Sequence, residues 1–531
     1  MKGIDKMKVA DRLGQVRSYC HLLTSYLSNW RNLILTAYLF FVLMSYFIVN
    51  MDLRNFGRAY IISLAEVILI ISIFLSTKLL HFAEDISIHH GSEEKITIKF
   101  FIETWLVSLA VFFAMYIIYY PGGFSPDSID QYGQAAGIKN YNDWHPVLHT
   151  LFAFTLPLKL SGGWVGSIVL FQIIVFSLAL AYMAFTLAEF GNIKYARLFL
   201  LYILINPATL GISMYPWKDV TFAVFAMLSM CFAVRVYFSD GEWLKSLGHM
   251  IIFLLVMAAA TIFRHNAILF TFPLLIAVMF YVSSKRKVLL AAGFVLIIFL
   301  IKIPLYSSLK AEKPGNRITE TTGVPITIMG NAVKETPDNI DTDIQEFIYA
   351  IAPRGAWEKK YRTGDFNSIK FSGVNTNIIE EAGYTKILDM MFRCFKKSHL
   401  ASLKGFLALT DMVYSIAGPV RWWIIPGIVH NKYGIEGRGV NLLQKIFVLY
   451  LRFTRWLCKH VFWHIGVLML IMFILILAKV YDIKKLFLVL ALFSHNFGTM
   501  LLLSGDDFRF FYCTYLIMPL VCLVLLVKKG A

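Results

Sequence analysis

Residues 164–188 read WVGSIVLFQIIVFSLALAYMAFTLA, an apolar run without a single charged side chain. A helix of about 20 apolar residues spans the hydrocarbon core of a bilayer. Comparable runs recur along the chain of 531 residues, which is 58% hydrophobic and only 16% charged. A soluble fold would need polar helix faces to cover so many runs, and these runs have none. The sequence therefore predicts an all-α polytopic membrane protein.

The prediction is twelve transmembrane helices. They lie near 32–50, 59–80, 100–119, 164–188, 198–213, 219–238, 248–263, 266–282, 288–305, 461–478, 486–503 and 511–527. The apolar segment 146–160 is short and follows Trp-His-Pro, so we expect it to lie at the outer interface without crossing. This arrangement gives a membrane domain over 32–305, an extracytoplasmic region over 306–460 with the length of a small domain, and C-terminal membrane helices over 461–531.

Basic residues set the orientation, because cytoplasmic loops carry an excess of Lys and Arg. Segment 1–31 is polar and basic and lacks a cleavable signal peptide, so we expect a cytoplasmic N-terminus. Twelve crossings then put the C-terminus and the other basic clusters in the cytoplasm: Lys95/Lys99, Lys194/Arg197, Lys245, Lys285/Arg286/Lys287, Lys479/Lys484/Lys485 and Lys528/Lys529. The net charge of +17 is thereby explained by basic cytoplasmic loops that face anionic lipid headgroups, and no nucleic-acid partner is expected.

The stretch 440–460 predicts an amphipathic helix. Four basic residues fall on one helical face, at spacings of 7, 3 and 4: Lys445, Arg452, Arg455 and Lys459. We interpret it as an outer interfacial helix. The alternative is a cytoplasmic helix after an extra span near 406–428. That run is interrupted by Asp411, Gly418, Pro419 and Arg421, which favours the interfacial interpretation.

Several classes of site have no sequence signal. The six cysteines are scattered, with no CxxC pair or Cys/His cluster, so neither a disulfide framework nor a zinc site is indicated. Walker A, GxSxG, GxGxxG and HExxH motifs are absent as well. Nucleotide chemistry in the cytoplasm is therefore not indicated.

The first long polar segment, 120–149, reads YPGGFSPDSIDQYGQAAGIKNYNDWHPVLH and faces outward in this topology. Asp127 is held by Pro126 and is a candidate general base toward an acceptor hydroxyl. Asp130 would share a helical face with Asp127, which favours a shifted pKa or a site for Mg²⁺ or Mn²⁺. The alternative is helix capping by Ser125 or Asp127. Whether a metal is required stays open.

Two histidines close the same segment. His145 precedes Pro146, which suits the first position of a helix. It is a candidate to assist catalysis by contacting a phosphate or the acceptor, and His149 is a second candidate for phosphate contact. The alternative is that the Trp-His pair simply anchors the chain at the interface.

Three cations are predicted to approach the same surface from distant turns. Lys218 begins one span, while Arg264 and Arg509 lie in outer turns. Converging Arg and Lys suit a phosphate or pyrophosphate group. The alternatives are snorkelling to lipid headgroups or ion pairing with Asp219, Asp506 and Asp507.

These motifs carry a resemblance to a known class. An acidic first outer loop, an interfacial helix, cationic turns and a late outer region resemble the GT-C superfamily of integral membrane glycosyltransferases. PGGFSPDSIDQY, NDWHPVLHT, WKD, FRHNA and DDFRFFY are similar to a largely uncharacterised multi-span family of Gram-positive bacteria grouped with these enzymes. The likeness covers roughly 100–305 and 461–527. It departs at Asp507-Phe508-Arg509-Phe510, where the family pattern has Tyr after Arg and a nearby Pro.

The resemblance implies a reaction and its partners. An acceptor hydroxyl on a cell-envelope glycan or glycolipid, deprotonated by Asp127, attacks the anomeric carbon of a polyprenyl-phosphate-linked sugar. Lys218, Arg264 and Arg509 would stabilise the leaving phosphate, His145 would assist either task, and the anomeric configuration would invert. The expected location is a bacterial plasma membrane, with the active site outside.

Two other functions compete with this one. A polymerase or ligase of lipid-linked oligosaccharides would also need an outer cationic site and a large outer region. A carrier of lipid-linked sugars or anions would instead place ionisable residues near the middle of the bilayer. Here they cluster at the outer ends of the predicted spans, which disfavours a carrier.

Overall fold

The computed structural model describes residues 29–88, 96–313, 315, 317–370, 373–420, 422, 424–505 and 507–528. Within these ranges the chain is helical and forms only isolated β-bridges, so the all-α prediction is confirmed. Nearly all of the predicted cytoplasmic segment 1–31 lies outside the described residues. So do Lys95, Arg421, Asp506 and Lys529.

The chain divides into two compact units, the smaller of which combines residues up to 86 with 473–480. Its described helices are α2 (Trp30–Asn50), η1 (Leu53–Asn55) and α3 (Arg58–Asp85). Helices α2 and α3 pack against each other, with the hydroxyls of Thr36 and Ser76 hydrogen-bonded at 2.8 Å between them. The outward-facing sides of both helices are apolar, as expected for helices in lipid.

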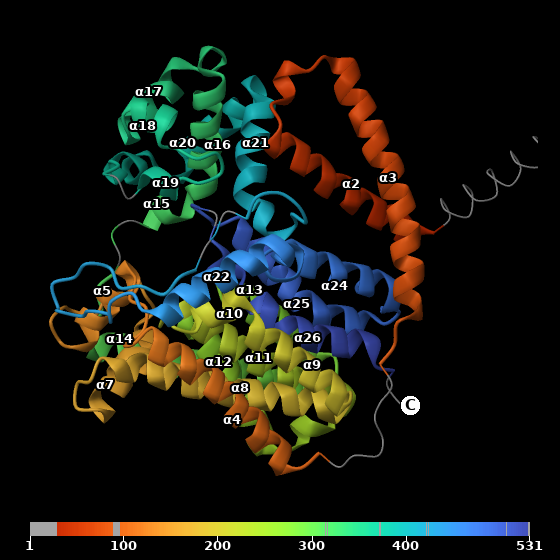
Figure 1. Ribbon diagram of the computed structural model, residues 1–531, viewed down its shortest axis with the longest axis vertical. Coiled ribbons are helices and arrows are strands. Elements are labelled where there is room, and N and C mark those ends of the chain that lie inside the picture. Colours follow the sequence, from red (N-terminus) through yellow and green to blue (C-terminus); the bar gives the residue numbers. More distant parts are fainter. Residues whose placement is uncertain are drawn as a thin grey trace, which may run out of the picture. The chain divides into compact units, whose positions relative to one another are not determined.

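The larger unit contains a body of apolar helices. The first part comprises α4 (Ile98–Ile118), α5 (Pro126–Ala135), α6 (Val147–His149), η2 (Thr150–Thr155), α7 (Leu156–Leu160), α8 (Gly166–Phe190), α9 (Ile193–Ile205), α10 (Pro207–Ile212), α11 (Lys218–Phe238), η3 (Glu242–Lys245), α12 (Leu247–Phe263), α13 (Ile268–Met279) and α14 (Ser284–Ser308). The last part comprises α22 (Leu442–Leu457), α23 (Lys459–Phe462), α24 (Ile465–Lys479), α25 (Ile483–Met500), η6 (Phe508–Phe511) and α26 (Cys513–Leu526). The residues of α24 from Phe473 onward belong to the smaller unit. Helix α11 is the centre, in contact with α8, α12, α13 and α26 (Figure 1).

Among the described residues, seven helices are long and apolar enough to cross a membrane, at Trp30–Asn50, Arg58–Asp85, Ile98–Ile118, Gly166–Phe190, Lys218–Phe238, Ser284–Ser308 and Phe508–Leu526. This supports a membrane protein, while twelve crossings stay a prediction. The run predicted as one span at 198–213 is in fact broken. Pro207 cannot donate a backbone hydrogen bond, so α9 ends at Ile205 and α10 begins anew with Asn206 as its N-cap.

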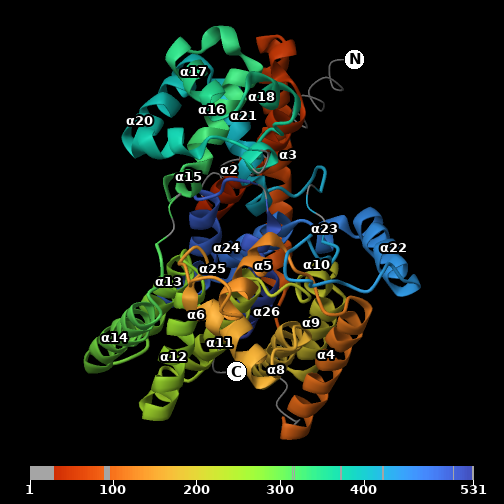
Figure 2. The same ribbon diagram turned by 90° about the vertical axis from the view of Figure 1, so that its left-hand side faces the viewer.

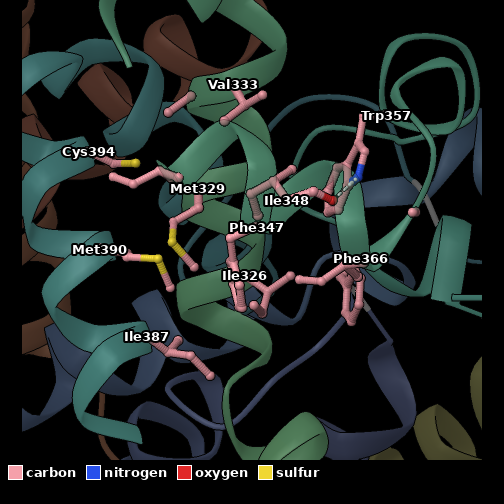
Figure 3. Packing of buried hydrophobic residues seen from close by; sticks show 14 of the residues in the cluster. Ile326, Met329, Val333, Phe347, Ile348, Trp357, Phe366, Ile387, Met390 and Cys394 are labelled. Carbon is pink, nitrogen blue, oxygen red and sulfur yellow. Dashed lines mark hydrogen bonds between the residues drawn. The ribbon is translucent and has the colours of Figure 1, made fainter. Parts of the chain in front are cut away.

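Residues 317–413 fold into a separate cluster of helices with its own apolar core. The helices are α15 (Arg317–Thr321), α16 (Gly323–Glu335), η4 (Pro337–Asn339), α17 (Thr342–Ile351), α18 (Arg354–Lys359), α19 (Asn367–Lys370), α20 (Thr376–Lys397), α21 (His399–Thr410) and η5 (Asp411–Val413). Trp357 is fully buried, and its ring is stacked with that of Phe366. Its indole Nε1 donates to the backbone carbonyl of Ile348 at 2.9 Å (Figure 3). We call residues 317–413 the helical domain. Its extracytoplasmic placement stays a prediction.

Two backbone connections link distant parts of the chain, one at the 120–149 segment and one at the turn before η6. Residues 424–441 follow α21 and η5 in the chain and pair with the start of the 120–149 segment. The backbone N–H of Phe124 donates to the Gly427 carbonyl at 2.9 Å, and that of Val429 donates to the Phe124 carbonyl at 3.0 Å. The helical domain contacts the turn before η6, where the Asn367 amide donates to the Ser504 carbonyl at 3.2 Å. The turn that carries Arg509 is therefore held from the domain side as well.

Candidate functional site

Helix α5 presents Asp127 in its first turn. Ser125 is the N-cap and accepts from the Ser128 amide at 3.4 Å, and Pro126 occupies the first turn as well. Trp217 fixes this cap by donating from its indole Nε1 to the Ser125 hydroxyl at 2.8 Å. The capping alternative is thus confirmed for Ser125. The carboxylate of Asp127 is left for other contacts.

Arg509 is the main partner of that carboxylate. Its Nη1 donates to Oδ2 of Asp127 at 2.9 Å, and its Nε lies 2.8 Å from Oδ2 of Asp507. The guanidinium lies over the ring of Trp217, with 5.0 Å between its Cζ and the ring centroid. The Arg509 side chain is 20% exposed and that of Asp127 31%, so the pair is reachable from solvent.

Asp219 lies between Arg264 and Arg509, the two arginines that the sequence analysis assigned to the site. Its side chain is 1% exposed; Oδ1 lies 3.2 Å from Nε of Arg264, and Oδ2 lies 3.9 Å from Nε of Arg509. Arg264 is also buried, donates from Nη1 to the Phe510 carbonyl at 3.0 Å and packs between the rings of Phe222 and Phe510. Ion pairing, the alternative foreseen for these cations, is confirmed for Asp219 and Asp507, while Asp506 lies outside the described residues.

Lys218 and His145 form the other side of the site. The Lys218 ammonium lies 3.4 Å from the carbonyl of Trp144 and 3.4 Å from Nδ1 of His145. Burial, followed by the charge of Lys218, lowers the pKa of His145 well below its ordinary value, so the ring is neutral near pH 7. Because an ammonium only donates, Nδ1 accepts and the ring proton sits on Nε2.

The net charge around Asp127 keeps it ionised. Burial acts to raise its pKa, but the positive charge of Arg509, with a smaller contribution from Lys218 and the hydrogen bond from Arg509, outweighs burial. The pKa is therefore below the ordinary value of an aspartate. As long as this ion pair holds, Asp127 is a weak base.

His149 is fully buried and both of its ring nitrogens are engaged. Nδ1 lies 2.6 Å from the Gln131 side-chain oxygen on α5, and Nε2 lies 3.1 Å from the Thr221 hydroxyl on α11. The π-helical turn η2 follows it directly. His149 thus joins the helix of Asp127 to the helix of Lys218, and in this geometry it has no free atom for a phosphate.

Asp130 points to a different set of partners. Its Oδ1 pairs with the Lys139 ammonium at 2.5 Å, and its Oδ2 accepts from the Gln134 amide at 2.8 Å. Among the described residues, no group of three His, Cys, Asp or Glu side chains is placed to hold a metal ion. Asp127 and Asp130 pair with different cations, so the two carboxylates do not converge on one site for the possible Mg²⁺ or Mn²⁺ ion, and we assign no step to a metal.

The structure thus brings Asp127, His145, Lys218, Arg264 and Arg509 together, and separates Asp130 from them. Comparison with protein-family models, curated proteins and solved structures finds no match for this chain. Sequence reasoning gave Ser125 only a capping role and assigned no role to Trp217. The only signal for Trp217 was its place beside Pro216 and Lys218 at the start of a span.

Proposed function

We propose that this protein is a GT-C-type membrane glycosyltransferase. In this proposal it transfers a sugar from a polyprenyl-phosphate-linked donor to a cell-envelope glycan or glycolipid on the outer face of a bacterial plasma membrane. One observation carries the proposal: an ionised carboxylate, Asp127, lies 2.9 Å from a guanidinium, Arg509, that is partly open to solvent. Such a pair supplies a proton acceptor and an anion-binding group at one point.

The bond changes in this reaction are those of an in-line displacement. Asp127 accepts the proton of the acceptor hydroxyl as its oxygen bonds to the anomeric carbon. The bond between that carbon and the phosphate oxygen breaks, and polyprenyl phosphate leaves with the electron pair. Arg509 and Lys218 stabilise the charge on the leaving phosphate, with Arg509 suited to two parallel hydrogen bonds. The configuration at the anomeric carbon inverts.

Asp127 and the donor phosphate compete for Arg509 in this mechanism. A phosphate that takes the Nη atoms of Arg509 displaces the carboxylate 2.9 Å away. Loss of that pairing raises the pKa of Asp127 and so strengthens it as a base. The base is then activated only when the donor is bound. Neutral His145 is 2% exposed, and in this proposal it assists by accepting a hydrogen bond from the Lys218 ammonium through Nδ1 and so orienting that cation.

Arg264 and His149 have positioning roles in this proposal. Arg264 is 5% exposed and reaches the open part of the site only through Asp219 and the Phe510 carbonyl. It therefore orients Arg509 without contacting the phosphate. His149 fixes the distance between α5 and α11, and hence between Asp127 and Lys218.

The proposed topology has twelve crossings, with the site outside. Four helix ends meet at the site: the end of α4 leads to Asp127, α11 begins at Lys218, α12 ends before Arg264, and α26 follows Arg509. Lys285 and Lys287 lie at the start of α14, whereas the last turns of α14 reach the site side, where the Tyr306 hydroxyl donates to Asp143 at 2.5 Å. Basic residues at the far end of α14 support a cytoplasmic location for that end. The clustering of ionisable groups at helix ends disfavours a carrier.

A transfer assay tests the proposal. The purified full-length protein in lipid nanodiscs is given radiolabelled polyprenyl-phosphate sugars and envelope glycan or glycolipid acceptors. We expect transfer by the wild type, a loss of at least about 100-fold in Asp127→Asn, and a near-normal rate in the matched control Asp130→Asn. Transfer by Asp127→Asn at the wild-type rate would show that the base is assigned wrongly. Absence of wild-type transfer with every donor would overturn the glycosyltransferase proposal.

A further inference from the structure

Helix α22 (Leu442–Leu457) packs on the body through one face only. The buried side chains on that face are Phe447, Leu451 and Thr454. At 100° per residue these three fall within an arc of about 60°. The Arg455 side chain, which the sequence places on the basic face, lies beside this packed face and donates to the Val420 carbonyl.

A wide arc of α22 outside the packed face is apolar and exposed. Its exposed members are Leu442, Leu443, Ile446, Leu449, Phe453, Trp456 and Leu457, with Trp456 79% exposed. They cover an arc of about 140°, whose centre lies about 120° around the helix from that of the packed face. In water such an array would be costly, because each large apolar side chain left exposed forgoes the favourable free energy of its burial. The array therefore calls for an apolar environment.

A basic stripe borders this arc on one side. Lys445 and Arg452 are spaced by seven residues, so they lie on one line along α22, between the packed face and the apolar arc, and Lys459 follows at the start of α23. Lys445 and Arg452 are exposed. No acidic side chain lies between 442 and 459 to neutralise the stripe.

The place of α22 in the fold is at the ends of membrane-length helices. Gln444 donates from its side chain to the carbonyl of Ile118, the last residue of α4, at 2.9 Å. The Tyr450 hydroxyl donates to Ile205, the last residue of α9. Figure 2 shows α22 at the edge of the helical body, beside α10. Helix α4 has 21 residues and is about 31 Å long, which matches the thickness of the hydrocarbon core. If α4 spans that core, α22 at its end lies at the depth of the headgroups.

We propose that α22 is a binding surface for anionic phospholipids. The apolar arc enters the acyl region, while Lys445, Arg452 and Lys459 contact the phosphates and other anionic groups of the headgroups. The apolar arc and the basic stripe together favour a lipid over a soluble anion, because a free phosphate has no apolar part to contact the seven apolar side chains. This inference does not depend on the glycosyltransferase proposal.

The test uses the full-length protein in nanodiscs that contain brominated lipids, which quench tryptophan on contact. Subtracting the signal of Trp456→Phe from that of the wild type isolates Trp456. We expect quenching by brominated phosphatidylglycerol at several-fold lower mole fraction than by brominated phosphatidylcholine, since each basic residue near an anionic surface favours it on the order of fivefold. The triple variant Lys445→Gln, Arg452→Gln, Lys459→Gln should remove this preference but keep the quenching by both lipids.

A charge-matched control carries Lys359→Gln, Lys360→Gln and Lys386→Gln, three exposed lysines of the helical domain, and should keep the full preference. The inference is overturned if neither brominated lipid quenches Trp456, as expected when a protein or a second copy of the chain covers α22. It is equally overturned if the α22 triple variant retains the preference, or if the control variant loses it to the same extent.

Discussion

Arg509 donates from Nη1 to Oδ2 of Asp127 at 2.9 Å, although 382 positions separate the two residues in the sequence. Both side chains are partly exposed, at 20% and 31%, so an incoming anion is able to reach the pair. In the free protein the Arg509 guanidinium is hydrogen-bonded to Asp127. It must release that carboxylate in order to bind a phosphate through the same Nη atoms. Binding and transfer should therefore respond in opposite directions when Asp127 loses its charge.

The first prediction concerns donor binding. Asp127→Asn should bind a polyprenyl phosphate several-fold more tightly than the wild type, because Arg509 is released from a competing carboxylate. Arg509→Gln should weaken binding by about 10-fold or more. Isothermal titration of the nanodisc-embedded protein measures both. Asp130→Asn, which alters an aspartate paired with Lys139, should leave the affinity unchanged; a gain in that control equal to the gain in Asp127→Asn would point to a general charge effect.

The second prediction concerns pH. The pKa of His145 in the folded protein is well below that of the unfolded chain, through burial and the charge of Lys218; Asp127, His149 and Arg509 also act on it. As pH falls below about 6.5, the unfolded chain takes up a proton that folded His145 does not, so stability drops by up to about 1.4 kcal/mol per pH unit. His145→Gln should flatten the fall of Tm between pH 7 and 5. An unchanged slope in that variant would contradict the assignment of a buried neutral ring.

The third prediction concerns Asp219. Asp219→Asn should lower the free energy of unfolding by about 3 kcal/mol, because it leaves the buried guanidinium of Arg264 without its carboxylate. Thermal unfolding in detergent, followed by the loss of soluble monomer, measures the effect. Asp338→Asn, on the surface of the helical domain, is the matched control and should change stability by less than about 0.5 kcal/mol. Equal stability of both variants would mean that the ion pair contributes little.

The fourth prediction concerns the core of the helical domain. A Cβ on Gly330 would lie 2.2 Å from the fully buried Trp357 ring, so Gly330→Ala should destabilise the protein by about 1–3 kcal/mol. Trp357→Ala should cost about 3–5 kcal/mol. Gly355→Ala, where a Cβ meets no atom within 4 Å, should be nearly neutral. Proteolysis rates of the helical domain distinguish the three, and equal rates would refute this description of the core.

The fifth prediction concerns topology. In a Cys20→Ser, Cys458→Ser background, whose four remaining cysteines are buried, Ala136→Cys should react with a membrane-impermeant maleimide added to intact cells. Ser284→Cys should react only after the cells are permeabilised. Both new positions are exposed, so lack of reaction reports the membrane and not burial. The reverse pattern would invert the proposed orientation.

The sequence by itself determined the helical class and the apolar segments. Runs such as 164–188 have no charged residue, and hydrophobicity of that length is a local property that needs no partner. It also identified Asp127, Lys218 and Arg509 as polar residues beside such runs. Pro207 signalled the break between α9 and α10. The prediction of one span over 198–213 followed the average hydrophobicity of the run instead.

Only the tertiary structure decided which of these residues meet. Asp130 lies three positions from Asp127, yet it turns to Lys139, while Arg509 comes from the far end of the chain. His149 and Arg264 are drawn into buried contacts that no local pattern encodes. Ion pairs and hydrogen bonds depend on positions in space, and packing of the helices around α11 sets those positions. The sequence therefore supplied the charged groups, and the packing assigned their partners.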